Sequence, residues 1–116
     1  MSWWRDFFNT VDSLEIDKIK NWFTDDIKLQ FANTPINGRE AAIGALSGFI
    51  GQLQSMKHNT GDVLENANKA FIDAVVTYNL KDGRSVNIPA GTFIQRNGSQ
   101  ISELKIYIDL APLFAA

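Results

Sequence analysis

Residues 82–114 read DGRSVNIPAGTFIQRNGSQISELKIYIDLAPLF, a stretch that predicts strands joined by tight turns. The dipeptides Asp82-Gly83 and Asn97-Gly98 tolerate the positive φ angles that tight reversals between strands require. The runs 85–96 and 101–110 alternate apolar and polar residues, as strands buried on one face do. Pro89 interrupts the first run, so we expect a bulge or an exposed edge there.

The last predicted strand has one apolar and one polar face, because successive strand residues point to opposite sides. The apolar face carries Leu104, Ile106 and Ile108. The polar face carries Glu103, Lys105, Tyr107 and Asp109. We expect the apolar face to look into the interior, so that Asp109 points outward unless a bulge turns it inward.

The remaining elements follow from the spacing of apolar residues. Helical spacing from Trp3 to Leu14 predicts a first helix. Asp12 followed by Glu15 fits a capping box, so a second short helix is expected to start there, with Phe23 on its buried stripe. Further along we predict a strand over 27–32, a loop to residue 38, a helix over 39–55, and strands over 56–66 and 70–80.

This order of elements is typical of an α+β fold, with helices on one face of an antiparallel sheet. The predicted helix 39–55 contains Gly44, Gly48 and Gly51, each of which costs about 1 kcal/mol relative to alanine. We expect close packing of this helix on the sheet to compensate. In the strand 70–80 we expect an inward face of Ile72, Ala74, Val76, Tyr78 and Leu80.

The composition is that of one domain over residues 1–116, with 45% hydrophobic residues and no cysteine. Disulfides, thiolate catalysis and cysteine-bound metals are therefore excluded, and one histidine cannot form a zinc site. The net charge of −2 argues against a nucleic-acid partner. Arg5 and Asp6 interrupt the N-terminal apolar run, and no run is long enough to span a membrane, so we expect a cytoplasmic protein.

The segment 82–114, its ending Tyr107-x-Asp109-x-Ala111-Pro112, and Trp22-Phe23-Thr24-Asp25-Asp26 carry a family resemblance. They resemble the SnoaL-like, or polyketide-cyclase-like, branch of the nuclear transport factor 2-like superfamily. The resemblance implies an NTF2-like cone, in which a curved antiparallel sheet wraps around three N-terminal helices and leaves an apolar cavity. It also implies a homodimer formed through the outer face of the sheet.

The catalytic positions that the resemblance implies hold apolar residues in this chain. Matching to ketosteroid isomerases places Phe7, Phe31 and Gly91 where those enzymes have a tyrosine and two aspartates. That isomerase chemistry is rejected, because it needs a carboxylate base and donors to an enolate oxygen. Matching to limonene epoxide hydrolases and cyclases places Ile106 at the catalytic aspartate and Asp109 at a second aspartate.

Three polar residues remain as candidates for the cavity. His58 carries an imidazole, the side chain that exchanges protons near neutral pH, and the alternative is a surface or sheet-edge histidine. Asp109 is a candidate acid or base, or a partner that orients His58; otherwise it is a carboxylate that caps a turn. Tyr78 can donate a hydrogen bond into a cavity, and otherwise it is a core residue.

We therefore expect the protein to bind a small apolar molecule without a cofactor or metal, and two alternatives remain open. One is a cofactor-free acid/base enzyme of the polyketide cyclase, isomerase or epoxide hydrolase type that uses His58 and Asp109. The other is a protein-interaction module that uses the outer sheet face. The predicted pocket consists of Phe7, Trp22, Phe31, Ile72, Val76, Tyr78, Phe93, Leu104 and Ile106.

Overall fold

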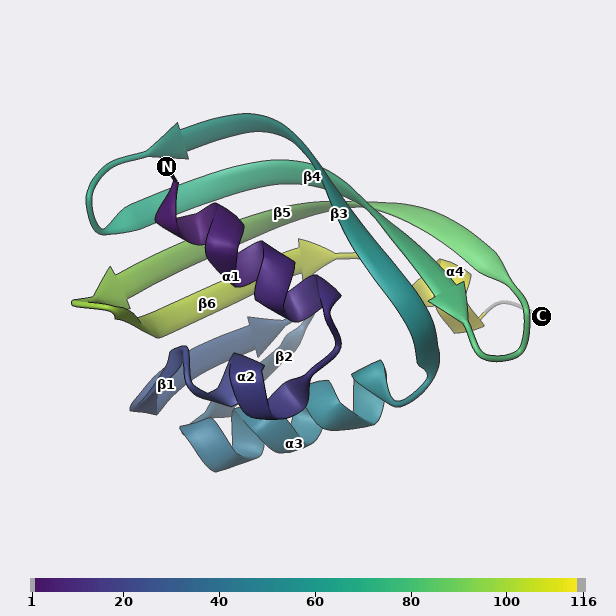
Figure 1. Cartoon of the computed structure of the whole chain (residues 1–116), viewed down its shortest axis with the longest axis horizontal. Helices are drawn as coiled ribbons and strands as arrows, with labels where there is room; N and C mark the ends of the chain where they lie inside the picture. The colour runs from purple at the N-terminus through teal and green to yellow at the C-terminus, as the bar shows by residue number, and fades with distance from the viewer. Residues whose placement is uncertain (1, 115–116) are drawn as a thin grey trace.

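A curved six-stranded sheet wraps around helices in the computed structural model, which describes residues 2–114 (Figure 1). The helices are α1 (Trp3–Asp12), α2 (Ile16–Lys20), α3 (Arg39–Ile50) and α4 (Ala111–Phe114). The strands are β1 (Phe23–Phe31), β2 (Thr34–Asn37), β3 (Leu53–Glu65), β4 (Lys69–Leu80), β5 (Ser85–Asn97) and β6 (Gln100–Ile108). The first three helices lie on the concave side of the sheet, and α4 lies near the β4–β5 turn. None of the helices within residues 2–114 has the length and apolarity needed to cross a membrane.

The strands follow the order β2-β1-β6-β5-β4-β3 across the sheet, which confirms the predicted α+β class. One pairing differs from the expected antiparallel sheet, because β1 and β6 run parallel. Parallel neighbours need a long connection, and here α3 and the strands β3 to β5 separate the two strands in the sequence. The early β1–β2 hairpin also replaces the loop expected before residue 38.

The two predicted turns and the predicted alternation are confirmed. Gly83 and Gly98 have φ angles of +95° and +65° and lie in the turns between β4, β5 and β6. Burial alternates strictly along most of β4, where the predicted inward residues are all buried. Pro89 pairs with Val75 of β4, whereas the pairing of β5 with β6 stops at Ala90. Proline therefore occupies a local edge, where β5 has no neighbour on the β6 side.

The N-terminal half differs from the expectation at the second helix. Asp12 ends α1 and does not cap α2, which begins at Ile16 after Glu15. The short helix stops at Lys20, and Phe23 begins β1, where it pairs with Ile101 of β6. The apolar residues predicted for the second helix are therefore divided between α2 and β1. Phe23 is in a strand because it pairs with β6, a distant segment that helical spacing cannot reveal.

The helix α3 is shorter than predicted. It ends at Ile50, and β3 already begins at Leu53, within the range expected to be helical. Gly44 and Gly48 are exposed, and an added Cβ atom at either position would meet no atom within 4 Å. The expected compensation by close packing is therefore wrong at these two glycines. The core-facing residues of α3 are Ala42, Leu46 and Ile50.

The core consists of two apolar clusters. One lies between the first three helices and the strands β1, β4, β5 and β6, and it includes Phe7, Ile19 and Leu104. The other lies toward the β4–β5 turn, where Leu113 of α4 and Tyr78 of β4 are buried. The inward faces of β4, β5 and β6 contribute to both clusters, so the concave side of the sheet is apolar along its length.

The exposed glycines of α3 predict that alanine stabilises the fold. Gly44→Ala and Gly48→Ala should each raise the free energy of unfolding by about 0.5–1 kcal/mol, because alanine restricts the unfolded chain and has room in the helix. Gly38→Ala is the matched control, since its φ of +93° disfavours any side chain and should make the variant less stable. Urea unfolding followed by circular dichroism measures these differences. A loss of stability in Gly44→Ala or Gly48→Ala would contradict the helix geometry described here.

Candidate ligand cavity

A small cavity lies between the helices and the concave face of the sheet, where the two core clusters meet. The centre of a water-sized sphere can move through about 60 Å³ of it, which is room for roughly four to six water-sized groups. It is lined by Phe7, Phe8, Val11, Ile19, Phe31, Leu46, Phe49, Ile50, Met56, His58, Val76, Tyr78, Ala90, Thr92, Leu104 and Ile106. Apart from His58, Tyr78 and Thr92, the lining side chains are apolar.

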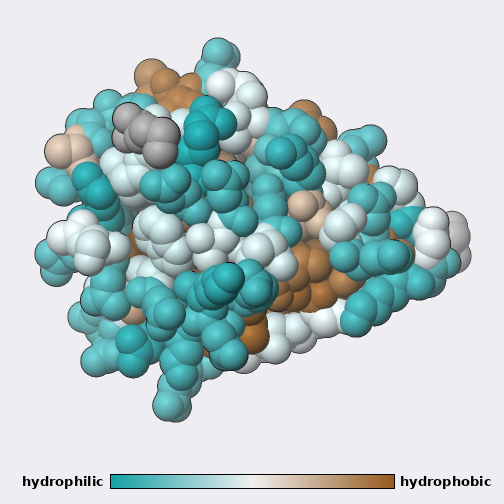
Figure 2. All heavy atoms as spheres, in the orientation of Figure 1, coloured by the Kyte–Doolittle hydropathy of each residue, from teal (hydrophilic) through white to brown (hydrophobic). Residues whose placement is uncertain are grey.

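The outside of the molecule shows apolar surface on the same side. Figure 2 shows brown, apolar side chains between the teal polar ones, in the hollow between the α1–α2 connection and β3. Polar and charged side chains cover most of the surrounding surface in this view. A ligand entering from solvent would therefore meet an apolar surface beside the cavity.

His58 lies at the cavity wall and is held by Asp12. Its Nδ1 atom is 2.6 Å from Oδ1 of Asp12, and its backbone N–H donates to Oδ2 of the same carboxylate at 3.0 Å. The ring of Phe8 stacks on the imidazole with a centroid distance of 4.2 Å and an interplanar angle of 22°. The side chains of His58 and Asp12 are only 11% and 15% exposed. The hydrogen bond at Nδ1 and the stacked ring of Phe8 therefore fix the orientation of the imidazole, and the backbone hydrogen bond holds the carboxylate in place.

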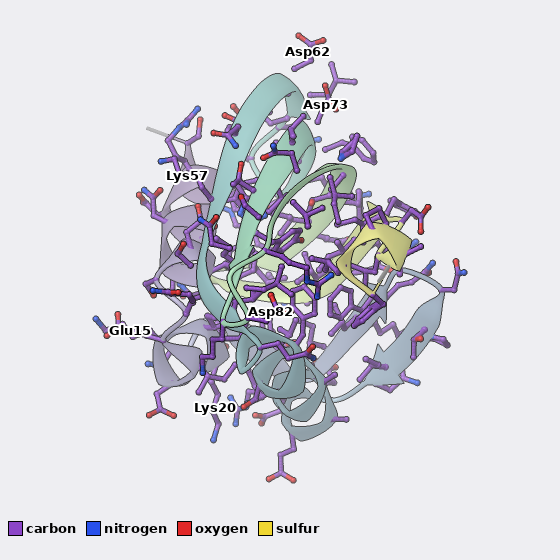
Figure 3. The ribbon with its side chains drawn as sticks, turned by 90° about the vertical axis from the view of Figure 1, so that its right-hand side faces the viewer. Glu15, Lys20, Lys57, Asp62, Asp73 and Asp82 are labelled. Carbon is purple, nitrogen blue, oxygen red and sulfur yellow. The ribbon has the colours of Figure 1, made fainter. Side chains whose placement is uncertain are left out.

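The local structure explains why these two residues meet. β3 is an edge strand, so alternate backbone N–H groups face away from the sheet. Asp12 ends α1, which packs against β3, and its carboxylate accepts one of these N–H groups at His58. Lys57, the residue before His58, projects from the molecule in Figure 3, so His58 points inward by alternation.

The contact with Asp12 determines which ring nitrogen of His58 carries the proton in the neutral form. A carboxylate has no proton to donate, so we assign the proton of the neutral ring to Nδ1, which donates to Asp12. The other nitrogen, Nε2, then has a free lone pair and accepts no hydrogen bond from any residue in the range 2–114. The pair therefore presents a proton acceptor at the cavity wall.

Tyr78 lies on β4, diagonally across from His58 on β3, and only 4% of it is exposed. Burial raises the pKa of its hydroxyl group far above the ordinary value, and the negative charge of Asp12 raises it further. The phenol therefore keeps its proton at every pH at which the protein is expected to work. Its hydroxyl group makes no hydrogen bond to a residue in the described part of the chain, so it can donate one to a ligand.

Six of the predicted pocket residues line the cavity: Phe7, Phe31, Val76, Tyr78, Leu104 and Ile106. The other three lie elsewhere. Trp22 packs edge-on against Phe7 and donates to the hydroxyl group of Thr10, and Ile72 is fully buried in the first cluster. Phe93 lies on the outer face beneath Lys105, because Thr92 and Ile94 are the inward residues on either side of it.

Asp109 and Gly91 are not brought to the cavity. Asp109 is exposed after the end of β6, where its carboxylate accepts the N–H of Ala111 and thereby caps the turn into α4. Asp109 therefore does not form a hydrogen bond with His58, whose ring contacts Asp12 instead. Gly91 lies against Phe71 on the outer face, and the inward polar residue next to it is Thr92. Ile106, at the position of the catalytic aspartate of epoxide hydrolases, does line the cavity.

Asp12 is the main functional candidate that sequence reasoning missed. The signal was present, because Asp12 follows Phe8 by four residues and so lies on the same buried face of the helix. A carboxylate on a buried face needs a polar partner, and the chain has a single histidine. Asp12 was instead interpreted as the first residue of a capping box, so it was not considered as a partner of His58. Within residues 2–114 no group of three or more histidine, aspartate or glutamate side chains could hold a metal ion.

The chain is similar to known proteins in its sequence profile and in its fold. Residues 4–104 match the sequence profile of the SnoaL-like domain family. No protein of curated function matches the sequence at a significant level. The match extends over α1 and β6, the elements that carry Asp12 and Leu104.

Solved structures share the fold at low sequence identity. A proposed SnoaL-like polyketide cyclase from Shewanella putrefaciens CN-32 has a TM-score of 0.84 and 11% identity, covering 97% of this chain and 90% of that chain. An NTF2-like protein of unknown function from Burkholderia pseudomallei K96243 has a TM-score of 0.82 and 10% identity, covering 98% and 96%. Another, from Exiguobacterium sp. 255-15, has a TM-score of 0.78 and 17% identity, covering 93% and 98%. These similarities confirm the expected fold.

The raised pKa of Tyr78 predicts a loss of stability at alkaline pH. Above the ordinary tyrosine value of about 10, the unfolded chain releases this proton while the folded chain keeps it. The folded state then binds more protons, so the free energy of unfolding falls as the pH rises, by at most about 1.4 kcal/mol per pH unit for one group. Urea unfolding between about pH 8 and about pH 11 measures this slope. Tyr78→Phe should flatten it, and parallel curves for the two proteins would contradict the burial of the hydroxyl group.

Proposed function

The chain belongs to the SnoaL-like domain family, and from that premise we propose that it binds a small, largely apolar molecule in the cavity described above. The observation that carries the proposal is a hollow whose wall is apolar except at His58, Tyr78 and Thr92. Small-molecule sites typically combine such a wall with a few placed polar groups. The apolar wall supplies affinity and the polar groups orient the ligand.

The volume of the cavity limits the size of the ligand. About 60 Å³ for the centre of a water-sized sphere suits a single ring or a short branched chain, and the fused rings of a steroid exceed it. A polyketide- or terpene-like fragment of this size meets the requirement. Its one polar group, a carbonyl or a hydroxyl, would lie against His58 and Tyr78, because burying that group elsewhere costs a hydrogen bond.

Filling the cavity provides the test of binding. Cyclohexanone and small terpenes such as limonene and carvone should raise the melting temperature, because a molecule that binds only the folded state stabilises it. Ala90→Leu places three further carbon atoms in the cavity wall and should abolish the shift. Leu64→Phe, at an exposed side chain of β3 that does not line the cavity, is the control and should preserve it. Equal shifts in wild type and Ala90→Leu would place the binding outside the cavity.

We also propose that the outer face of the sheet joins two copies of the chain. Phe71, Val75 and Tyr107 are 42%, 43% and 46% exposed on this face, and the rings of Phe71 and Tyr107 stack at 6.4 Å. Gly91 permits this arrangement, because a Cβ atom there would lie 2.9 Å from the ring of Phe71. Large exposed apolar side chains gathered on one face are typical of protein interfaces. A self-complementary contact of this kind suits a two-fold dimer.

Sedimentation equilibrium tests the dimer. The wild type should sediment as a dimer, and Tyr107→Lys should sediment as a monomer, because it places a charge in the centre of the apolar face. Phe114→Lys, which changes an exposed apolar residue on α4, is the control and should remain dimeric. A monomeric wild type would exclude the dimer and would leave this face for a different protein partner.

A further inference from the structure

The polar corner of the cavity, formed by His58 and Tyr78, holds one hydrogen-bond acceptor and one donor. Nδ1 of His58 donates to Asp12 at 2.6 Å, so Nε2 of the neutral ring presents only a lone pair. The hydroxyl group of Tyr78 makes no hydrogen bond to another residue of the described chain, so its hydrogen is available. A ligand group that pairs with both must itself donate one hydrogen bond and accept another.

Both of these polar atoms reach open space. Within residues 2–114, the side-chain nitrogen and oxygen atoms that are inaccessible and have no partner belong to Trp3, Thr24 and Arg39. Nε2 of His58 and the hydroxyl oxygen of Tyr78 have no partner either, but they are not among these inaccessible atoms. Since both side chains are largely buried and line the cavity, a ligand in the cavity can contact both atoms.

The two side chains are close enough to contact one small ligand. Tyr78 pairs with Met56 and His58 pairs with Val76, so His58 and Tyr78 are diagonal neighbours on the concave face. Aromatic side chains in this relation are within reach of each other. Burial, and then the negative charge of Asp12, raise the pKa of the Tyr78 hydroxyl group. The second effect requires this hydroxyl group to lie near the carboxylate that His58 contacts.

We propose that the cavity selects small alicyclic alcohols over ketones of the same size. The hydroxyl group of the ligand donates to Nε2 of His58 and accepts from the hydroxyl group of Tyr78, since an alcohol oxygen can do both. This proposal rests on the ligand binding proposed above and names the class of ligand. It concerns recognition alone, and no covalent bond of the ligand forms or breaks.

A ketone leaves one of the two wall groups unpaired. Its oxygen can accept from Tyr78, but a ketone has no hydrogen to donate to Nε2 of His58. A ligand that fills the cavity also keeps water away from Nε2, and a buried acceptor without a donor weakens binding. Thr92 does not change this comparison, because a threonine hydroxyl group can donate or accept and therefore pairs with either kind of ligand.

Asp12 sets the preference through the tautomer of His58. One oxygen of its carboxylate accepts the backbone N–H of His58, and the other accepts the ring N–H at Nδ1. In Asp12→Asn the backbone N–H still needs an oxygen, so the amide nitrogen is the atom that faces Nδ1 and donates to it. The proton of the neutral ring then lies on Nε2, which becomes a donor and suits a ketone.

The test is isothermal titration calorimetry of the full chain with cyclohexanol and cyclohexanone, which share the same ring and differ in the polar group. Wild type should bind cyclohexanol about tenfold more tightly, because only the alcohol pairs with Nε2. His58→Phe keeps an aromatic ring against Phe8 and should abolish this preference. Tyr78→Phe should weaken binding of both compounds by a similar factor, since each accepts a hydrogen bond from this hydroxyl group.

Asp12→Asn separates the positioning role of the carboxylate from its contribution to the fold. Nitrogen-15 NMR of the neutral imidazole should show the proton on Nδ1 in wild type and on Nε2 in the variant, and the preference for cyclohexanol should disappear or reverse. Asp109→Asn makes the same substitution at a carboxylate that caps a turn outside the cavity. This matched control should keep the wild-type tautomer and the wild-type preference.

The outcomes distinguish this proposal from ligand binding alone. If wild type binds cyclohexanol and cyclohexanone equally well, the selection of alcohols is wrong and the binding of small apolar molecules stands. If neither compound nor a small terpene binds, both proposals fail. If His58→Phe does not fold, Asp12→Asn still decides, because a preference for cyclohexanol that survives this substitution would overturn the role assigned to Nε2.

Discussion

The alternation of side chains along β4, β5 and β6 is the constraint on which the rest of this structure depends. β4 and β5 place every second residue on the concave side along most of their length, β6 does so from Leu104 onward, and these residues are almost all apolar. Burying an apolar side chain contributes about 1.5–3 kcal/mol relative to leaving it exposed. A shift of one residue in any of these strands would send that whole set to solvent, so the register is strongly specified. The core and the apolar wall of the cavity both follow from this one arrangement.

Against this apolar background, the contact between Asp12 and His58 is the main polar arrangement inside the cone. A partly buried carboxylate is tolerated there because it accepts two hydrogen bonds, one from the backbone of an edge strand and one from the imidazole. The same contact joins α1 to β3, covers part of the sheet edge and orients the only histidine of the chain. The same carboxylate therefore stabilises the fold and orients the histidine of the candidate site. Removing the carboxylate would affect both, which is why its positioning role has to be separated from its structural role.

Most of the strand arrangement could be predicted because strand signals are local. Gly83 and Gly98 mark turns through their own backbone freedom, and the faces of β4 and β6 follow from residues two apart. The same reasoning applied to β5 would have placed Phe93 outside, since Ile88, Ala90, Thr92 and Ile94 form its inward face. Including Phe93 in the predicted pocket was therefore inconsistent with the parity of its own strand. The close packing expected at the glycines of α3 was also wrong, because Gly44 and Gly48 lie on the exposed side of the helix, where no other atom comes within 4 Å of an added Cβ atom.

By itself, the sequence determined the α+β class, the turns and the strand parity with its apolar inward face, since each depends on neighbours within a few residues. Only the tertiary structure decided that β1 runs parallel to β6, that Asp109 caps a turn outside, and that Asp12 holds His58. Asp12 and His58 are 46 residues apart, and no periodicity connects them. They meet because the curved sheet brings its edge strand over the end of the first helix. The physical reason is that a hydrogen bond acts over about 3 Å, so only the folded chain selects the partner of a buried charge.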